Sequence, residues 1–205
     1  MDEQPATPYT IRDAVPNDAP DLSRIAVMAG HGLMDIFYEG LIPGHSPAQV
    51  IAERRVLRPG SFAALERWRV LVDGERRLLG ALNSFPHDLF EAAEPDPLLT
   101  PERTSILDDL SELEASAKGS YYVNMIAVLP ERRGAGAGLA LMAEAERLAR
   151  QAGFTRMSLV TFDADHSLLA FYRRCGFEIA GTRPIKPHPA IEHGGNWALM
   201  SRELA

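Results

Sequence analysis

The sequence contains a single cysteine and no long apolar segment. Cys175 stands alone among 205 residues, which excludes an internal disulfide and favours a reducing compartment. No stretch reaches the roughly 18 consecutive apolar residues of a membrane-spanning helix. Residues 1–10 show neither the basic flank nor the apolar core of an export signal. We therefore expect a cytoplasmic protein that does not act on a membrane.

Positive charge is also in short supply. The chain has 21 lysine and arginine residues against 28 aspartate and glutamate residues, for a net charge of −7. Surfaces that bind nucleic-acid phosphates are basic, so we expect no nucleic-acid partner and favour a small ligand. Because 46% of the residues are hydrophobic, we expect one sizeable core and one domain over residues 1–205.

Apolar periodicity predicts strands that pair early in the chain and strands that alternate with helices later. A first strand is expected at 9–14, followed by a helix from about Pro20 that breaks near Gly30–Gly32 and a helix at 46–58. Asp73–Gly74 between two apolar runs predicts a hairpin. Later strands are expected at 121–128, 156–162, 177–183 and 197–204, and helices at 138–153 and 166–176. This order predicts a mixed α/β sheet.

Residues 86–119 differ from the rest of the chain because they are rich in proline and acidic residues. We expect an insertion or a lid here. Its carboxylates would suit a cationic ligand, although acidic runs also form ordinary solvated surfaces. The prolines are Pro86, Pro95, Pro97 and Pro101, and the acidic residues include Glu102, Asp108, Asp109, Glu112 and Glu114.

A glycine-rich segment precedes the predicted helix at 138–153. Gly134, Gly136 and Gly138 alternate with other residues directly after Arg132 and Arg133. The first turn of a helix offers unpaired N–H groups and the positive end of the helix dipole, so it binds anions. Glycines allow the backbone to approach a phosphate closely, and an arginine adds charge. The segment therefore predicts a pyrophosphate site, with a plain flexible turn as the alternative.

Two other phosphate-binding motifs fit less well. A Walker loop needs Lys-Ser/Thr after its last glycine, whereas Leu139 follows Gly138. A dinucleotide-binding loop needs a third glycine at position 139 and a strand immediately before it. Asp163, at the end of the next strand, does imitate the acid that binds ribose in such folds. A nicotinamide site therefore stays open as a weaker alternative.

These motifs resemble the GNAT superfamily of acetyl-coenzyme A-dependent N-acetyltransferases. The family signature Arg/Gln-x-x-Gly-x-Gly/Ala is matched by Arg133, Gly136 and Gly138. The family also carries an Asn seven positions before a Tyr; here the Tyr is Tyr172, and Asp165 replaces the Asn. A Gly-Phe pair follows at 176–177. The motifs cover residues 121–177, and the first half agrees by element order.

The resemblance implies a fold and a coenzyme site. The fold would be a single-domain, mostly antiparallel mixed sheet of about seven strands, flanked by helices and splayed between strands 121–128 and 156–162. The pantetheine arm would enter that gap, and Tyr172 would lie near the sulfur as a catalytic donor. The residues implied in coenzyme binding are Ile126, Ala127, Val128, Arg133, Gly134, Ala135, Gly136, Ala137, Gly138, Asp165 and Tyr172.

Acetyl transfer to an amine also requires a proton acceptor. An amine with a lysine-like pKa costs about 4 to 5 kcal/mol to deprotonate at neutral pH. Family members often use a Glu on the strand before the glycine loop, and Asn124 occupies that place here. Asn124 cannot act as a base; it either orients water or the amine, or is a buried amide that ties the strand to a loop. The proton would then leave through His31, Asp35, Glu39 or a carboxylate of 86–119.

The acceptor site is the least constrained part of the sequence. His31, Asp35 and Tyr38 fall in the broken first helix, which lines the acceptor cleft in this family, and His193 falls in the loop 184–196. The histidines lack a nearby cysteine or second cluster, so we expect no metal. Cys175 precedes the helix-ending Gly176, where packing explains it better than a covalent role. A homodimer is possible.

The sequence as a whole favours an N-acetyltransferase that uses acetyl-coenzyme A and a primary amine, by direct attack in a ternary complex. The acceptor is either a small-molecule amine or a protein amine. Asn124 in the place of the usual base keeps a non-catalytic coenzyme A or nucleotide sensor open as an alternative. A nicotinamide-dependent oxidoreductase is the weaker one.

Overall fold

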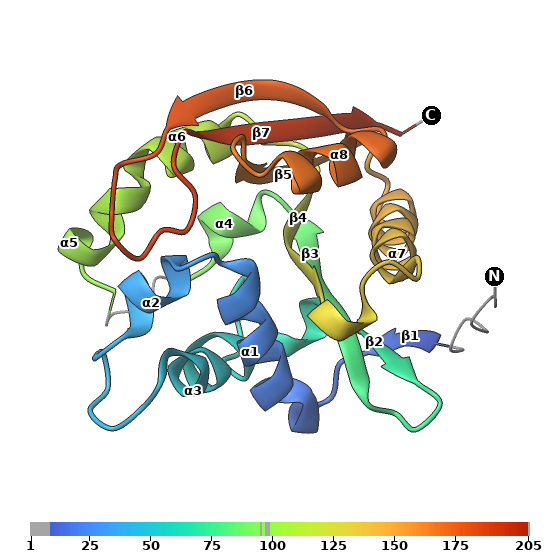
Figure 1. The fold of residues 1–205 in the computed structure, drawn as a ribbon, viewed down its shortest axis with the longest axis horizontal. Helices are drawn as coiled ribbons and strands as arrows, with labels where there is room; N and C mark the ends of the chain where they lie inside the picture. The colour runs from blue at the N-terminus through green and yellow to red at the C-terminus, as the bar shows by residue number, and fades with distance from the viewer. Residues whose placement is uncertain (1–8, 95, 97–98, 205) are drawn as a thin grey trace.

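The computed structural model of the chain describes residues 9–94, 96 and 99–204. One seven-stranded sheet runs through them in the order β1-β2-β3-β4-β5-β7-β6 (Figure 1). All neighbours are antiparallel except β4 and β5, which confirms the predicted mixed, mostly antiparallel sheet. The strands are β1 (Tyr9–Asp13), β2 (Trp68–Asp73), β3 (Leu78–Pro86), β4 (Tyr121–Val128), β5 (Arg156–Phe162), β6 (Glu178–Pro184) and β7 (Asn196–Glu203).

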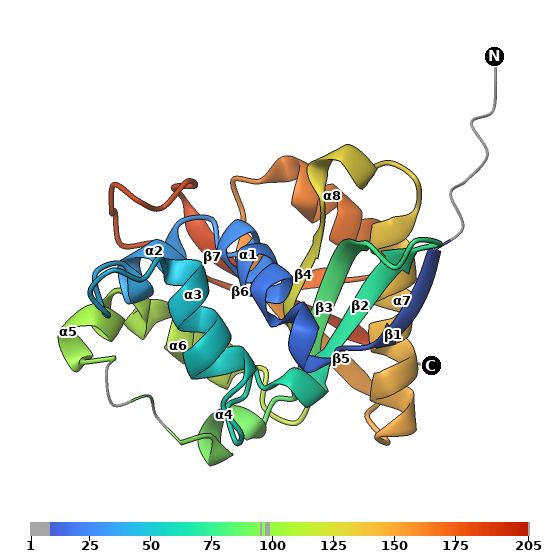
Figure 2. The ribbon, with the colours of Figure 1, turned by 90° about the horizontal axis from the view of Figure 1, so that it is seen from below.

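Helices cover both faces of the sheet and enclose two apolar cores. Figure 2 shows α1, α3 and α6 on one side of the sheet and α7 and α8 on the other. No helix in the described ranges has the length and apolar character to cross a membrane. The helices are α1 (Ala19–Ala29), α2 (Leu33–Tyr38), α3 (Pro47–Ile51), α4 (Leu89–Ala92), α5 (Pro101–Thr104), α6 (Asp108–Ala115), α7 (Ala137–Gln151) and α8 (His166–Arg174).

Local sequence signals set several of these boundaries. Ser46 caps α3: the Ser46 hydroxyl accepts from the Gln49 amide, and the Gln49 side chain accepts from the Ser46 amide at 2.9 Å. The helix continues as a π-helical turn over Ala52–Val56. At the predicted hairpin, Asp73 Oδ1 accepts from the amide of Arg77 at 2.9 Å. The helix start and the hairpin thus form where the sequence predicts them, and a capping box holds the helix start.

The sheet is splayed between its two central strands. β4 and β5 pair at Tyr121–Met157 and Tyr122–Ser158, and the described register contains no further pair between them. Just beyond this point the pairing of β4 with β3 skips Asn124, which is therefore the extra residue of a β-bulge. A bulge bends its strand and increases the local twist. The bulge thus explains why β4 turns away from β5 here.

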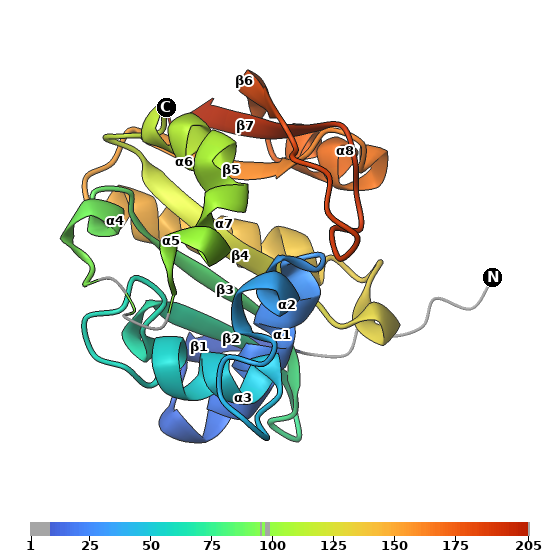
Figure 3. The same ribbon diagram turned by 90° about the vertical axis from the view of Figure 1, so that its left-hand side faces the viewer.

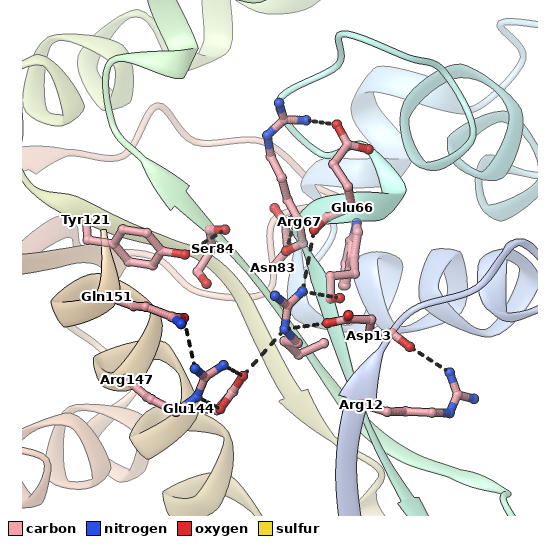
Figure 4. Close-up of polar contacts among 12 residues, drawn as sticks. Arg12, Asp13, Glu66, Arg67, Asn83, Ser84, Tyr121, Glu144, Arg147 and Gln151 are labelled. Carbon is pink, nitrogen blue, oxygen red and sulfur yellow. Dashed lines mark hydrogen bonds and ion pairs between the residues drawn. The ribbon is translucent and has the colours of Figure 1, made fainter. Parts of the chain in front are cut away.

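A chain of ion pairs fixes α7 against the outer strands (Figure 4). Arg69 Nε lies 3.0 Å from Asp13 Oδ1 and 3.4 Å from Glu144 Oε1. Arg147 also donates to Glu144 at 2.7 Å and to Gln151 at 2.9 Å, and it holds the pKa of Glu144 below its usual value. Because Arg69 and Glu144 are only 18% and 14% exposed, the contact between these two is less screened than a surface pair. These ion pairs set the position from which the first turn of α7 reaches the site.

The turn between α1 and α2 is locked to the loop before β7. His31 and Gly32 both have positive φ, at 46° and 90°. A Cβ on Gly32 would collide with the carbonyl oxygen of Ala190, and the Glu192 amide donates to the His31 carbonyl at 3.2 Å. Figure 3 shows this loop descending beside the α1–α2 turn. The predicted helix break is confirmed, and close backbone contact is its reason.

The acidic segment 86–119 contains α4, α5 and α6. Pro95 and Pro97 lie outside the described residues. α6 packs against the sheet through Leu110 and Leu113, which are 8% and 2% exposed. The segment therefore contributes apolar side chains to the core as well as a charged surface.

Candidate active site

A cleft opens where β4 and β5 separate. It has a volume of about 310 Å³ and is bounded by both strands, α8, the first turn of α7 and the end of α1. Its lining residues are Met28, Ala29, His31, Val123, Asn124, Met125, Ile126, Ala127, Val128, Arg133, Gly138, Val160, Thr161, Phe162, Asp165, Ser167, Leu168, Phe171 and Tyr172. Many of the residues singled out in the sequence therefore meet in one place.

The glycine segment forms the N-terminal end of α7. Gly134 and Gly136 have φ of +84° and +79°, a left-handed conformation that glycine adopts without strain. Gly138 has a different reason: a Cβ there would lie 3.3 Å from the ring of Phe171. Within the described chain no side chain caps α7, so its first amides remain available to an anion. The segment thus fits a pyrophosphate, and two of its glycines are also required by the backbone.

Arg133 ties this segment to the end of β4. Its Nε donates to the Val128 carbonyl at 3.1 Å, and its Nη2 lies 4.0 Å from Met28 Sδ. The guanidinium therefore holds the loop in place at the rim of the cleft. A second donor face of the same group is left for an anion, because a guanidinium carries five N–H donors.

Asp165 and Tyr172 are both on the α8 side of the cleft. Asp165 Oδ1 caps α8, accepting from the Leu168 amide at 2.9 Å and the Ser167 hydroxyl at 2.8 Å. Burial raises the pKa of Asp165, but these two hydrogen bonds outweigh burial and hold the pKa below its usual value. Tyr172 is 5% exposed, and burial raises the pKa of its phenol. The Tyr172 hydroxyl is therefore neutral at physiological pH and keeps its proton.

Asn124 is tied to the neighbouring strand and also lines the cleft. Its Nδ2 donates to Asn83 Oδ1 at 2.8 Å, and Asn83 in turn donates to the Arg67 carbonyl at 3.2 Å. The described residues provide no hydrogen bond to Asn124 Oδ1. The side chain is thus held by one end, and its oxygen is open to the cleft as an acceptor.

Two histidines converge at the mouth of the cleft. His31 Nδ1 lies 2.9 Å from Glu192 Oε2, His193 Nε2 lies 3.7 Å from Asp165 Oδ2, and the two imidazole centroids are 4.9 Å apart. One donor atom each from His31, Asp165 and His193 lies within 4.8 Å of the others, so this is the group among the described residues whose spacing could hold a metal ion. The sequence could not reveal it, since His31 and Glu192 are 161 positions apart.

Asp35 and Tyr38 lie elsewhere. Neither lines the cleft. Tyr38 is 1% exposed and packs near the guanidinium of Arg55, 5.8 Å from its ring centroid. α2 turns Tyr38 into the core, so it is not placed to contact a ligand in the cleft. We do not retain either residue as an acceptor contact.

A second cavity of about 170 Å³ adjoins the first. Asn124, Met125, Val160, Thr161 and Phe162 line both. Its outer wall comes from α2, α6 and the aromatic side chains below them. Glu114 lines this cavity and accepts a hydrogen bond from the Tyr122 hydroxyl at 2.6 Å. The sequence suggested a carboxylate of 86–119 as proton acceptor but did not single out Glu114.

Asp163 is engaged in holding a loop. Its two carboxylate oxygens accept from the amide and the side chain of Asn196, at 2.8 Å and 2.7 Å, and these bonds keep the pKa of Asp163 low. The adjoining Gly195 has no room for a Cβ because of this carboxylate. The one residue that favoured a nicotinamide site is thus explained by loop structure.

Cys175 lies outside the cleft lining, and burial raises the pKa of its thiol. A raised pKa reduces the thiolate fraction that a covalent route requires. We expect Cys175→Ala to keep most of the acetyl-transfer rate, measured as thiol release, and to form no acetylated protein that mass spectrometry can detect. Complete loss of the rate in a folded variant, with an acetyl group trapped on wild-type Cys175, would contradict this.

Fold and site together define an acyltransferase: a splayed sheet, an uncapped glycine-rich helix start at the gap, and a buried tyrosine opposite it. The chain belongs to the acetyltransferase (GNAT) family, whose model matches residues 49–177.

Solved structures of acetyltransferases share this fold. An acetyltransferase crystal structure superposes with a TM-score of 0.67 at 18% identity, covering 96% of this chain and 100% of the other. An N-acetyltransferase from Staphylococcus aureus Mu50 superposes with a TM-score of 0.64 at 18% identity, covering 94% of this chain and 99% of the other. Mosquito arylalkylamine N-acetyltransferase like 5b superposes with a TM-score of 0.64 at 17% identity, covering 96% of this chain and 100% of the other. No sequence among curated proteins matches the chain.

Proposed function

We propose that the protein transfers the acetyl group of acetyl-coenzyme A to a primary amine by direct attack in a ternary complex. The observation that carries this proposal is the pair of adjoining cavities. One runs from α7 and α8 to Asn124, and the other runs from Asn124 to α2 and α6. Two substrates entering from opposite sides would meet at their shared wall.

The first cavity suits the coenzyme. The β5-facing side of Ile126, Ala127 and Val128 has no strand partner in the described sheet, so its backbone groups are open to the amides of a pantetheine arm. Arg133 and the amides of Gly134, Ala135, Gly136, Ala137 and Gly138 would hold the pyrophosphate. Asp165 shapes this wall by starting α8.

Tyr172 would stabilise the sulfur that leaves as the amide forms. Proton transfer from a phenol of ordinary pKa near 10 to a thiolate whose thiol has a pKa of about 8.5 costs about 2 kcal/mol. Burial raises the pKa of Tyr172 further, so full proton transfer costs more still. Tyr172 therefore acts as a hydrogen-bond donor as the C–S bond breaks. Asn124, which lines both cavities, would accept a hydrogen bond at Oδ1 from the attacking amine or from a water beside it.

The acceptor enters from the other side. In this proposal residues 1–205 form one domain, and the segment 86–119 provides one wall of the acceptor cavity through α6. His31 lines the coenzyme cavity close to Ala29, which lines both cavities, and His193 packs on His31. In this proposal the two histidines contact the end of the acceptor that reaches the shared wall.

A thiol-release assay tests the proposal. The protein and acetyl-coenzyme A are incubated with one amine at a time, and the amines are methylamine, hexylamine, 2-phenylethylamine and lysine. Free thiol is followed with a chromogenic disulfide. We expect amine-dependent release with at least one of them, and the N-acetylated product by mass spectrometry. Binding of acetyl-coenzyme A without release, across these and peptide amines, would instead indicate a coenzyme A sensor.

A further inference from the structure

We propose that Glu114 is the group that receives the proton of the acceptor amine, and that the cavity around it selects amines with an apolar body. This inference rests on the acetyl transfer proposed above and identifies the acceptor class.

The helix pattern of α6 places a carboxylate within an apolar stripe. Leu110, Leu113 and Ala117 are 8%, 2% and 2% exposed, and Glu114 shares their face of the helix because residues three and four apart are neighbours. The other acidic residues of the segment lack this setting: the Glu112 side chain, for example, is 70% exposed. Glu114 is therefore the acid of α6 that faces the cavity.

The walls of the cavity are mostly apolar, and the polar groups are those of Arg55, Glu114, Tyr122, Asn124 and Thr161. Leu33, Met34 and Phe37 come from α2, and Phe62, Phe90 and Trp197 close the other sides. Each methylene that an amine buries here should improve its affinity about fourfold. A volume of about 170 Å³ holds an amine of several carbons, whereas methylamine would leave most of it unfilled. The cavity thus fits an alkyl or aryl primary amine.

The titratable groups that face Glu114 come from β4, the turn after α3 and the segment after β3. Tyr122 of β4 donates to it at 2.6 Å, and Arg55 of the turn after α3 acts on it through space. His87, after β3, lies against the Glu114 backbone, and burial lowers its pKa, so it is neutral. On the exposed side, Arg183 of β6 faces Glu112 at 3.9 Å. Burial outweighs Tyr122 and Arg55 and raises the pKa of Glu114 to about 7.

A carboxyl group with that pKa suits a base at neutral pH. Tyr122 and Glu114 line the second cavity, Tyr172 lines the first, and Asn124 lines both. The proposed base and the sulfur-side donor therefore lie in the two cavities that meet at Asn124.

The proton balance is simple. The ammonium group gives one proton to the Glu114 carboxylate, directly or through a water, and the freed nitrogen pair forms the C–N bond while the C–S bond breaks. A second proton leaves the nitrogen as the amide forms, and the departing thiolate takes up a proton. Glu114 then releases its proton to solvent, so one proton is released per thiol formed.

The test compares Glu114→Gln with Glu112→Gln, a matched change on the exposed face of the same helix. kcat/KM for hexylamine is measured from about pH 5.5 to about pH 9 in thiol release. The wild type should rise with pH and level off above a pKa of about 7. Glu114→Gln should be at least 10-fold slower at neutral pH, and its deficit should shrink at alkaline pH, where solvent has deprotonated more of the amine. Glu112→Gln should follow the wild type.

Two further measurements complete the test. Tyr122→Phe removes a hydrogen bond that lowers the pKa of Glu114, so the inflection should move to higher pH. Wild-type kcat/KM should be higher for hexylamine and 2-phenylethylamine than for methylamine. A Glu114→Gln profile identical to wild type would overturn the role of Glu114 while leaving acetyl transfer intact. If the wild type acetylates no amine, the proposed function itself fails.

Discussion

Tyr172→Phe is expected to lower kcat about 10- to 1000-fold, the range for loss of one donor to a developing charge, with little change in affinity for acetyl-coenzyme A. The substitution keeps the ring that packs beside Phe171, with centroids 5.3 Å apart, and deletes only the hydroxyl. Because burial keeps that hydroxyl protonated, the loss should persist across neutral and mildly alkaline pH.

Tyr121→Phe provides the control. Tyr121 is also buried, at 6% exposed, but its hydroxyl reaches the Ser84 carbonyl at 3.5 Å and is outside the cleft lining. It should retain wild-type turnover. Coenzyme affinity is read by calorimetry and turnover by thiol release. Wild-type kcat in folded Tyr172→Phe would make Tyr172 a packing residue only.

Gly136→Val is expected to weaken binding of acetyl-coenzyme A about 100-fold or more. A branched side chain would stand at the start of α7, where the free amides are expected to meet the pyrophosphate, and losing two charge-assisted hydrogen bonds costs about 3 kcal/mol. Gly136 also has φ of +79°, so valine strains the loop itself. Folding stability should therefore fall as well, and the experiment must separate the two effects.

Gly153→Val separates them. Gly153 follows the other end of α7 with φ of +81°, and a Cβ there meets no atom within 4 Å. It should lose a comparable amount of thermal stability while binding acetyl-coenzyme A as the wild type does. Equal affinities for the two variants would remove the α7 start from the coenzyme site.

The second half of the chain could be predicted from sequence because its signals are local. The apolar run 121–128, the glycine segment and the helical pattern at 166–176 each act within a few residues, and β4, α7 and α8 form where these signals place them. The resemblance to the GNAT family also implied a gap between β4 and β5. It could not show the Asn124 bulge, since a bulge is a mismatch of register between two strands.

The acceptor side could not be predicted from the sequence because its structure depends on contacts between segments that are far apart in the chain. The approach of His31 to Glu192 follows from a loop that packs on the α1–α2 turn, and no local pattern encodes it. The sequence suggested Tyr38 as an acceptor contact because it falls in the broken first helix, yet α2 turns its side chain into the core. Glu114 carried one usable signal: a charge inside the stripe of Leu110, Leu113 and Ala117.

The short contact between β4 and β5 has a mechanical consequence. Strands β1–β4 and strands β5–β7–β6 are joined in the sheet by two residue pairs, so the two halves meet at a joint rather than along a continuous edge. Ser158 takes part in this joint but lines neither cavity. A substitution at Ser158 is therefore expected to change the width of the gap without touching either ligand. Proteins of this fold would then differ in the width of the gap because they differ in the residues that pair β4 with β5.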